Sequence, residues 1–576
     1  MKGRRAAKLK MPTWATGPPL AGDRQGGPLP PRRWGLARTV PVLLGCGLVA
    51  AVAMFTNLSY GLPLYYHPDE PIKAMSAVEL VRGRIPWRFN HPHFMLFFSA
   101  PFLYLGKGMG VHPILAARAA VATLGVATVC LLFVIGRSLA GWTAGVAAAL
   151  IYATAPLAVV AAHDFKEDIP LAFWLTVQLY FLVRYLRGAR SRDLFLAAVA
   201  LGASVGTKYT GLIAAPMLVG AVALGPAPDR RWKTLGIAAL LTAVGFLAST
   251  PSVLWHPREF LTGVVFEGQH AIFGHGIQDS LDAEGKFSVR YPGDPLKISA
   301  VSSLWTYHLR YSLAPGISIA GLLLMLVGAF TAVTRGDRAW WLVVAGLALL
   351  YLALETLPLK PPPFAARYMV ILLPYAALLG GGALGFAWQS RLPFKVLVVL
   401  LFAATIGING FASFRQVRAM QHDTRDGART WIVRNVPHGA RLIIPGLIWY
   451  TPFAGSFRPQ DFPYDIVAVE HPTFSELLTA GLDPRAYLVV SSFNYQRYLD
   501  HPDFNPDMYR FYRLLFDRYA PLVTLQAPFR PLGYHNPTIM IFHLAGRSSA
   551  LPLPSPAVSG DAFAKDRGSL ANNIIR

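Results

Sequence analysis

Residues 141–162 read GWTAGVAAALIYATAPLAVVAA, a run without a charged residue, and the next six residues, 163–168, read HDFKED. A spanning α-helix needs about 20 apolar residues, so this run is long enough to cross a membrane. A carboxylate at membrane depth costs about 2.5–3.5 kcal/mol, so acids next to such a run indicate a function. The stretch therefore predicts a membrane helix with a cluster of candidate functional acids at its end.

The whole chain of 576 residues has the composition of a membrane protein. It is 54% hydrophobic and only 14% charged, with a mean hydropathy of +0.40, whereas soluble proteins are about a quarter charged. The net charge of +23 does not indicate nucleic acid, because Lys and Arg occur in short loops between apolar runs, where they set membrane orientation. Cys46 and Cys130 both lie inside apolar runs and predict neither a disulfide framework nor a cysteine metal site.

The predicted fold class is a polytopic α-helical membrane protein with about eleven transmembrane helices. The predicted spans are 38–57, 113–137, 141–162, 169–187, 193–207, 209–225, 234–250, 315–334, 339–357, 368–388 and 396–413. The apolar run 94–106 is short for a span. If it lies at the membrane interface, the basic loops fall on the same side as the basic N-terminal tail, as the positive-inside rule requires. Segment 71–87 has the spacing of an amphipathic helix that lies on the membrane.

This topology predicts a multi-pass protein of the cell (inner) membrane with a cytoplasmic N-terminus. Residues 1–37 are basic and rich in Pro and Gly and predict a disordered cytoplasmic tail, and the transmembrane module is 38–413. Its external loops are 58–112, 163–168, 251–314 and 358–367.

After residue 413 the composition becomes soluble. A helix over 424–435 with Thr424 as N-cap, a helix over 508–519, and short strands over 441–445, 487–492 and 538–543 predict a small external α/β domain at 414–545. Residues 546–576 have the composition of a disordered tail.

A second acidic stretch, His67-Pro68-Asp69-Glu70, lies on the same predicted face as 163–168. Transfer of a sugar from a polyprenyl phosphate requires a carboxylate beside the acceptor hydroxyl and cations for the leaving phosphate. Asp69 or Glu70 is suited to be the base, and Asp168 to hold the site directly or through a metal. The candidates for phosphate contact are Lys208, Lys360 and Arg367.

The chain also resembles a known family in an ordered set of motifs. These are Asp69-Glu70, DIPLAFW at 168–174, GTKYTG at 206–211, Arg367-Tyr368 with Pro374, and Asp423-Thr424-Arg425 followed by Ala428, Trp431-Ile432 and Pro437. Over roughly residues 38–440 they resemble the GT-C glycosyltransferases of the protein O-mannosyltransferase and aminoarabinose transferase type, glycosyltransferase family 39. The resemblance implies an inverting transferase that uses a polyprenyl-phosphate sugar. It implies Asp69 as the base and Asp168 as a supporting acid, with Asp164 and Glu167 as alternatives to Asp168.

Several candidate residues are also explained by a purely structural role. Asp69, Glu70 and Asp168 are placed to cap the helices that follow them, and Lys208 to snorkel at the interface. His91, with the other external histidines, leaves a divalent metal open.

The competing functions are a transporter or lipid flippase and a non-catalytic scaffold. Against a carrier, the acids lie at one face and not at the midplane. The sequence leaves open the sugar, hexose or pentose, and the acceptor, which is a lipid, a protein or a glycan.

Overall fold

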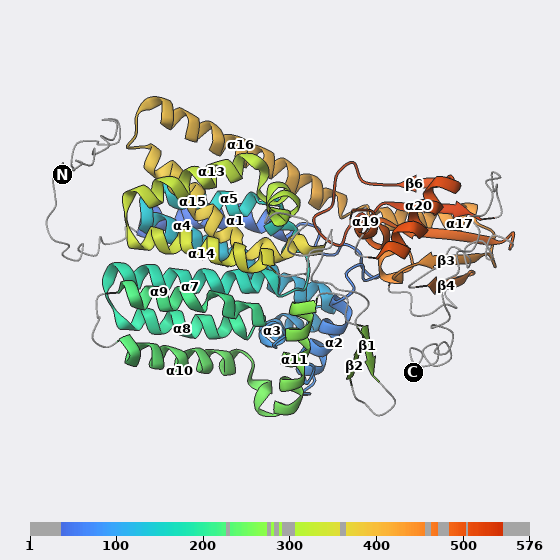
Figure 1. Cartoon of the computed structure of the whole chain (residues 1–576), viewed down its shortest axis with the longest axis horizontal. Coiled ribbons are helices and arrows are strands. Elements are labelled where there is room, and N and C mark those ends of the chain that lie inside the picture. The colour runs from blue at the N-terminus through green and yellow to red at the C-terminus, as the bar shows by residue number, and fades with distance from the viewer. Residues whose placement is uncertain are drawn as a thin grey trace, which may run out of the picture.

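The structure is a computed structural model that describes residues 36–225, 231–273, 278–281, 287–290, 306–356, 364–454, 462–469, 483–500, 502 and 505–544. Most of it is a bundle of helices whose axes run along the long axis of the molecule, and a small sheet domain lies at one end (Figure 1). The predicted disordered tails 1–37 and 546–576 lie outside the described residues, except for the first two residues of the opening helix, Leu36 and Ala37.

The membrane part is built from helices of 10 to 28 residues. They are α1 (Leu36–Phe55), α4 (Pro113–Ala140), α5 (Trp142–Thr154), α7 (Asp168–Gly188), α8 (Ser191–Val205), α9 (Ala215–Leu224), α10 (Arg231–Ser249), α13 (Ala314–Arg335), α14 (Arg338–Thr356), α15 (Leu373–Ala387) and α16 (Leu392–Ala419). Eight helices in the described part of the chain are long and apolar enough to cross a membrane. The predicted fold class is thereby confirmed, whereas the count of eleven spans stays a prediction.

Three predicted spans, 141–162, 193–207 and 209–225, are not among these eight, because the helices that form there are shorter than predicted. The predicted span 141–162 is broken before Pro156, because the residue before a proline is driven out of the α region, and Ala155 has φ −62° and ψ 118°. The chain then continues as α6 (Pro156–Ala161). The span 209–225 starts as the 3-10 helix η2 (Tyr209–Ala214) before α9, and α8 has only 15 residues.

Helix α15 forms the centre of the bundle, packed between α5 and α13. It continues the 3-10 helix η7 (Phe364–Leu372), and 94% of the residues in an 18-residue window of the span Ala366–Ala387 are buried. The helices approach closely because small residues line the contact. A Cβ added to Gly381 would lie 2.5 Å from the carbonyl oxygen of Ala144 in α5.

Shorter elements gather at the end of the bundle that faces the sheet domain (Figure 1). They are α2 (Glu70–Val81), α3 (Phe94–Gly108), η4 (Pro251–Leu254), α11 (Pro257–Phe273), the strands β1 (Gln278–Leu281) and β2 (Phe287–Arg290), and the π-helical turn η6 (Leu309–Leu313). Helix α2 exposes Ile72 and Met75, as the predicted amphipathic helix requires. Helix α3 covers the predicted interfacial run 94–106 and has 15 residues.

The C-terminal domain is a five-stranded sheet with helices, as the predicted fold class has it. Its elements are α17 (Thr424–Asn435), β3 (Arg441–Pro445), the 3-10 turn η8 (Ile448–Tyr450), β4 (Asp465–Val469), β5 (Ala486–Ser491), α19 (Ser492–Asp500), α20 (Pro506–Arg518), β6 (Val523–Leu525) and β7 (Ile539–His543). The strand order is β4-β3-β5-β7-β6, with β3 parallel to β4 and β5 and the other pairs antiparallel. The N-cap of α17 is Asp423, whose side chain accepts a hydrogen bond from the N–H of Arg425, and not the predicted Thr424.

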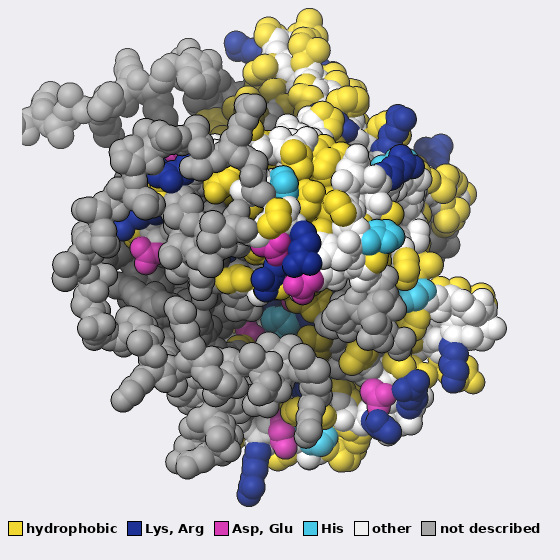
Figure 2. Space-filling view, turned by 90° about the vertical axis from the view of Figure 1, so that its right-hand side faces the viewer, with side chains coloured by type: hydrophobic (Ala, Val, Ile, Leu, Met, Phe, Trp, Pro, Cys, Tyr) yellow, Lys and Arg dark blue, Asp and Glu magenta, His cyan; other side chains and the backbone are white. Residues whose placement is uncertain are grey.

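The two parts of the molecule have different surfaces. Many large apolar side chains of the membrane helices are exposed, for example Leu44, Phe330 and Leu400. Seen from the end that carries the C-terminal domain, basic, acidic and histidine side chains appear among apolar ones (Figure 2). This pattern is expected of a bundle in lipid that ends in water.

Candidate active site

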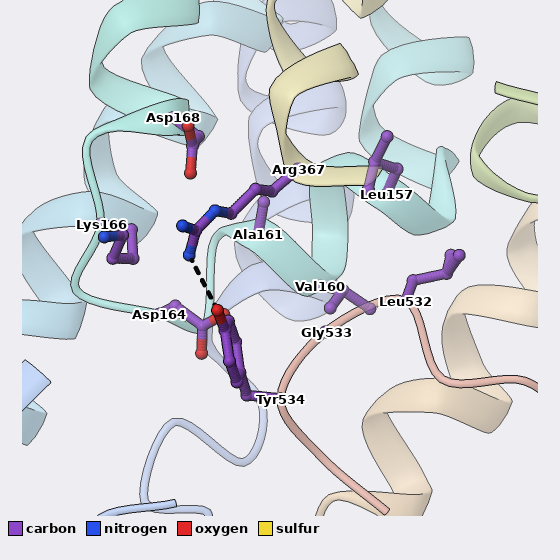
Figure 3. A pocket seen from close by; sticks show the side chains of 10 residues that line it. All are labelled: Leu157, Val160, Ala161, Asp164, Lys166, Asp168, Arg367, Leu532, Gly533 and Tyr534. Atoms are coloured by element: carbon purple, nitrogen blue, oxygen red, sulfur yellow. Dashed lines mark hydrogen bonds between the residues drawn. The ribbon is translucent and has the colours of Figure 1, made fainter. Parts of the chain in front are cut away.

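Five chain segments meet where the bundle joins the C-terminal domain. They are the turn 56–69 after α1, the turn 162–167 between α6 and α7, the starts of η2 and η7, and the loop 526–538 between β6 and β7. A pocket lies among them, lined by Leu157, Val160, Ala161, Asp164, Lys166, Asp168, Arg367, Leu532, Gly533 and Tyr534 (Figure 3). The fold thus brings the two predicted acidic stretches together with Arg367.

Asp69 is the most accessible acid of the site. Its side chain is 40% exposed, and its Oδ2 lies 2.6 Å from Lys166 Nζ and 3.8 Å from an Arg367 guanidinium nitrogen. Partial burial of the Asp69 carboxyl acts to raise its pKa. The positive charges of Lys166 and Arg367 outweigh this effect, so the pKa lies well below its ordinary value. Asp69 is therefore an ionised carboxylate that can accept a hydrogen bond from a bound group.

Glu70 is placed differently from its neighbour, although the sequence made the two equal candidates for the base. Its side chain is fully buried, and both oxygens accept hydrogen bonds from Arg118, at 2.8 and 2.6 Å. The N–H of Phe165 donates a third bond of 2.7 Å. Because a paired and buried carboxylate is poorly available to a substrate, we assign Glu70 a positioning role: it joins α2 to the turn 162–167.

Asp168 starts α7 and faces the beginning of η2. Its Oδ1 accepts a 2.9 Å hydrogen bond from Lys208 Nζ, and both side chains are nearly buried. The Lys208 ammonium also lies 4.8 Å from the centre of the Tyr368 ring. The predicted supporting acid, phosphate cation and Tyr368 are therefore neighbours.

Glu167 contacts α2 through Lys73. It pairs with Lys73, its Oε2 lies 3.6 Å from Lys166 Nζ, and the His91 ring nitrogen is 4.0 Å away. Burial lowers the pKa of Lys73 to about 8, so this ammonium remains mostly charged at neutral pH. The arrangement links His91 and α2 to the acids of the turn 162–167.

Asp164 is buried and lines the pocket. One of its oxygens accepts a short hydrogen bond from the Tyr60 hydroxyl. Burial, and next the negative charge of Glu70, raise the pKa of Asp164 to about 7. Asp164 therefore changes its charge near neutral pH, unlike Asp69.

Arg367 reaches across the pocket from the start of η7 (Figure 3). Its Nη1 donates to the Tyr534 hydroxyl at 3.3 Å, and its guanidinium lies 5.5 and 5.7 Å from the centres of the Tyr368 and Tyr534 rings. Within the described ranges, its buried Nε has no hydrogen-bond partner. An unpaired guanidinium donor in a pocket is suited to an anionic ligand. Lys360, the other predicted cation, lies outside the described residues.

The histidines of these loops do not converge on one point. His93 contacts Ser252 and the carbonyl oxygen of Arg88, and His163 contacts the carbonyl oxygens of Val159 and Thr56. In the parts of the chain that the structure describes, no three residues of the types His, Cys, Asp and Glu are grouped as metal ligands. The site acids instead face Lys and Arg.

Sequence reasoning gave no role to several residues that form the site. Lys166 lies inside the acidic cluster 163–168, and its position between acids is a signal in the sequence. Arg118 was a single charge inside an apolar span, which marks a functional or paired group. Tyr534 had no signal, because nothing local shows that a residue of the C-terminal domain returns to the bundle.

The fold and pocket define an integral membrane protein with a charged site at one end of its helices. Residues 90–255 match the profile of the family described as dolichyl-phosphate-mannose-protein mannosyltransferase. The match confirms the predicted resemblance to the GT-C glycosyltransferases over these residues. No curated protein matches the chain.

Among solved structures, the chain is similar to ArnT from Cupriavidus metallidurans bound to undecaprenyl phosphate, with 15% identity, coverage of 90% of this chain and 100% of that chain, and a TM-score of 0.47. It is also similar to the Archaeoglobus fulgidus oligosaccharyltransferase, with 13% identity, coverage of 86% of this chain and 72% of that chain, and a TM-score of 0.46. The chain is also similar to the S. cerevisiae protein O-mannosyltransferase Pmt1-Pmt2 complex bound to the sugar donor, with 16% identity and a TM-score of 0.31. This match covers 42% of this chain and 36% of that chain.

Proposed function

We propose that the protein transfers a hexose or pentose from a polyprenyl-phosphate sugar to an acceptor hydroxyl of a lipid, protein or glycan at the external membrane face. The observation that carries the proposal is that Arg367 and Lys166, which line the pocket, also face an accessible carboxylate, Asp69. It lies at the end of the membrane helices, where a lipid-linked phosphate sits. The profile match over residues 90–255 supports the same class of donor.

The reaction that this geometry suits is a single displacement with inversion. The acceptor oxygen attacks the anomeric carbon while Asp69 takes the hydroxyl proton, and the bond from that carbon to the phosphate oxygen breaks. The polyprenyl phosphate leaves with the electron pair. Arg367, with Lys208 and Lys166, stabilises the charge that grows on the phosphate.

The charge balance of the site supports a phosphate ligand. When Asp164 holds its proton, the ion-paired groups around the pocket leave one positive charge in excess. The cations are Lys73, Lys166, Lys208 and Arg367, and the carboxylates are Asp69, Glu167 and Asp168. A sugar–phosphate–lipid diester carries one negative charge and would neutralise the excess.

Purified protein in detergent or liposomes tests this function. We expect it to release polyprenyl phosphate from at least one member of a panel of polyprenyl-phosphate hexoses and pentoses when membrane extract supplies acceptors. Release and transfer of a labelled sugar are measured by thin-layer chromatography and mass spectrometry. Absence of release with every donor, from protein that is folded and monodisperse, would contradict the proposal.

The proposed orientation, with the N-terminus in the cytoplasm and the site outside, has its own test. In a variant with Cys46 and Cys130 replaced by alanine, single cysteines replace Met109, Val433 or Trp388, which are 73%, 53% and 57% exposed. An impermeant thiol reagent added to intact cells or spheroplasts should label Met109→Cys and Val433→Cys, but Trp388→Cys only after lysis. Labelling of Met109→Cys only after lysis would mean that α3 crosses the membrane.

A further inference from the structure

The loop between β6 and β7, residues 526–538, leaves the sheet and docks on the membrane part. Leu532 packs with Tyr60, Val160 and Met420 in one buried cluster. The following Gly533 passes so close to α6 that an added Cβ would lie 2.7 Å from Val160 Cγ1. The C-terminal domain therefore touches the same turns that carry the site acids.

A buried ion pair, Asp423 with Arg425, contributes to holding the loop backbone. Arg425 Nη2 donates to the carbonyl oxygen of Tyr534, and Nη1 donates to the carbonyl oxygen of Tyr66 at 3.2 Å. Asp423 Oδ2 accepts a 2.7 Å bond from the N–H of Asn536. The same arginine thus fixes the loop and the segment that leads to Asp69.

The side chain that this backbone directs into the pocket is Tyr534, which is only 6% exposed. Its hydroxyl accepts the bond from Arg367 Nη1 at 3.3 Å. Its ring lies 4.1 Å from the His67 ring, at an angle of 50°. Tyr534 therefore lies between the guanidinium and the turn that precedes Asp69.

We infer that Tyr534 is a positioning residue through which the C-terminal domain completes the phosphate site. This inference rests on the proposed function. Among the described residues, the bond to Tyr534 is the hydrogen bond that orients the Arg367 side chain. With that bond, the C-terminal domain holds one edge of the guanidinium. Because a guanidinium has five N–H groups, the others stay available to the phosphate of the sugar donor.

The test compares Tyr534→Phe with a matched control, Tyr512→Phe. Tyr512 is also buried in the C-terminal domain, but its hydroxyl bonds the carbonyl oxygen of Pro445, away from the pocket. Binding of undecaprenyl phosphate to each purified full-length variant is measured by its thermal stabilisation. We expect the Kd to rise about tenfold in Tyr534→Phe, the loss expected for a hydrogen bond to a charged group, and to stay unchanged in Tyr512→Phe.

A double-mutant cycle separates positioning from space filling. If Tyr534 acts through Arg367, Tyr534→Phe should have no further effect on Kd when Arg367 is already alanine. A Kd for Tyr534→Phe within twofold of the wild-type value, or equal and additive losses in both backgrounds, would overturn the inference. Because binding is read without turnover, this outcome differs from failure of the proposed function, in which no donor is consumed by the wild type.

Discussion

Replacing Asp69 by asparagine is expected to lower kcat for sugar transfer by roughly 10²–10⁴-fold, the usual contribution of a general base. The amide cannot take the acceptor proton, although it keeps the size of the carboxyl. The Asp69 side chain is 40% exposed, and Lys166 keeps Glu167 at 3.6 Å as a partner. Expression and thermal stability should therefore stay close to those of the wild type, and the loss should appear in the rate.

Glu79→Gln is the matched control for this substitution. Glu79 lies in the same segment, on α2, and its carboxylate bonds Arg82 and Arg84 on the surface. Its replacement should leave transfer unchanged, because exposed ion pairs contribute little. Near-wild-type transfer by Asp69→Asn would exclude Asp69 as the base, and Asp164, which has its pKa near 7, would be the next candidate.

The sequence was sufficient for the features that depend on local composition. The membrane class follows from apolar runs whose length is set by the bilayer, and the position of Asp69, Asp168, Lys208 and Arg367 at helix ends follows from the same runs. The charge of the loops also predicted that these helix ends lie on one side of the membrane.

What could not be predicted depends on contacts between distant segments. Asp69 and Glu70 are adjacent in the sequence, but only the fold shows that Arg118 binds Glu70 and leaves Asp69 accessible. Tyr534 stands 167 positions from its partner Arg367. The short strands β4 and β6 were missed for a similar reason, because such strands are stabilised by their neighbours in the sheet and have weak local signals.

Replacing Arg367 by alanine is the second change with a large expected effect. A planar guanidinium matches two phosphate oxygens at once, whereas an ammonium is a point charge. We expect kcat/KM for the polyprenyl-phosphate donor to fall roughly 10²–10³-fold in Arg367→Ala, the size found for the loss of a transition-state oxyanion donor. Arg367→Lys should lose less, because it retains the charge, and dependence on the acceptor concentration should change little in both variants.

Arg441→Ala provides the control, because this substitution also removes one guanidinium. Arg441 pairs with Asp465 at 3.3 Å on the surface of the C-terminal domain, far from the pocket. The loss in Arg367→Ala should appear in kcat as well as in KM, because the negative charge on the leaving phosphate grows in the transition state. A change in KM alone would mean that Arg367 only binds the ground state of the donor. Donor kinetics equal to the wild type would eliminate Arg367 as the phosphate anchor and leave Lys208, held by Asp168 at 2.9 Å, as the cation that the geometry favours next.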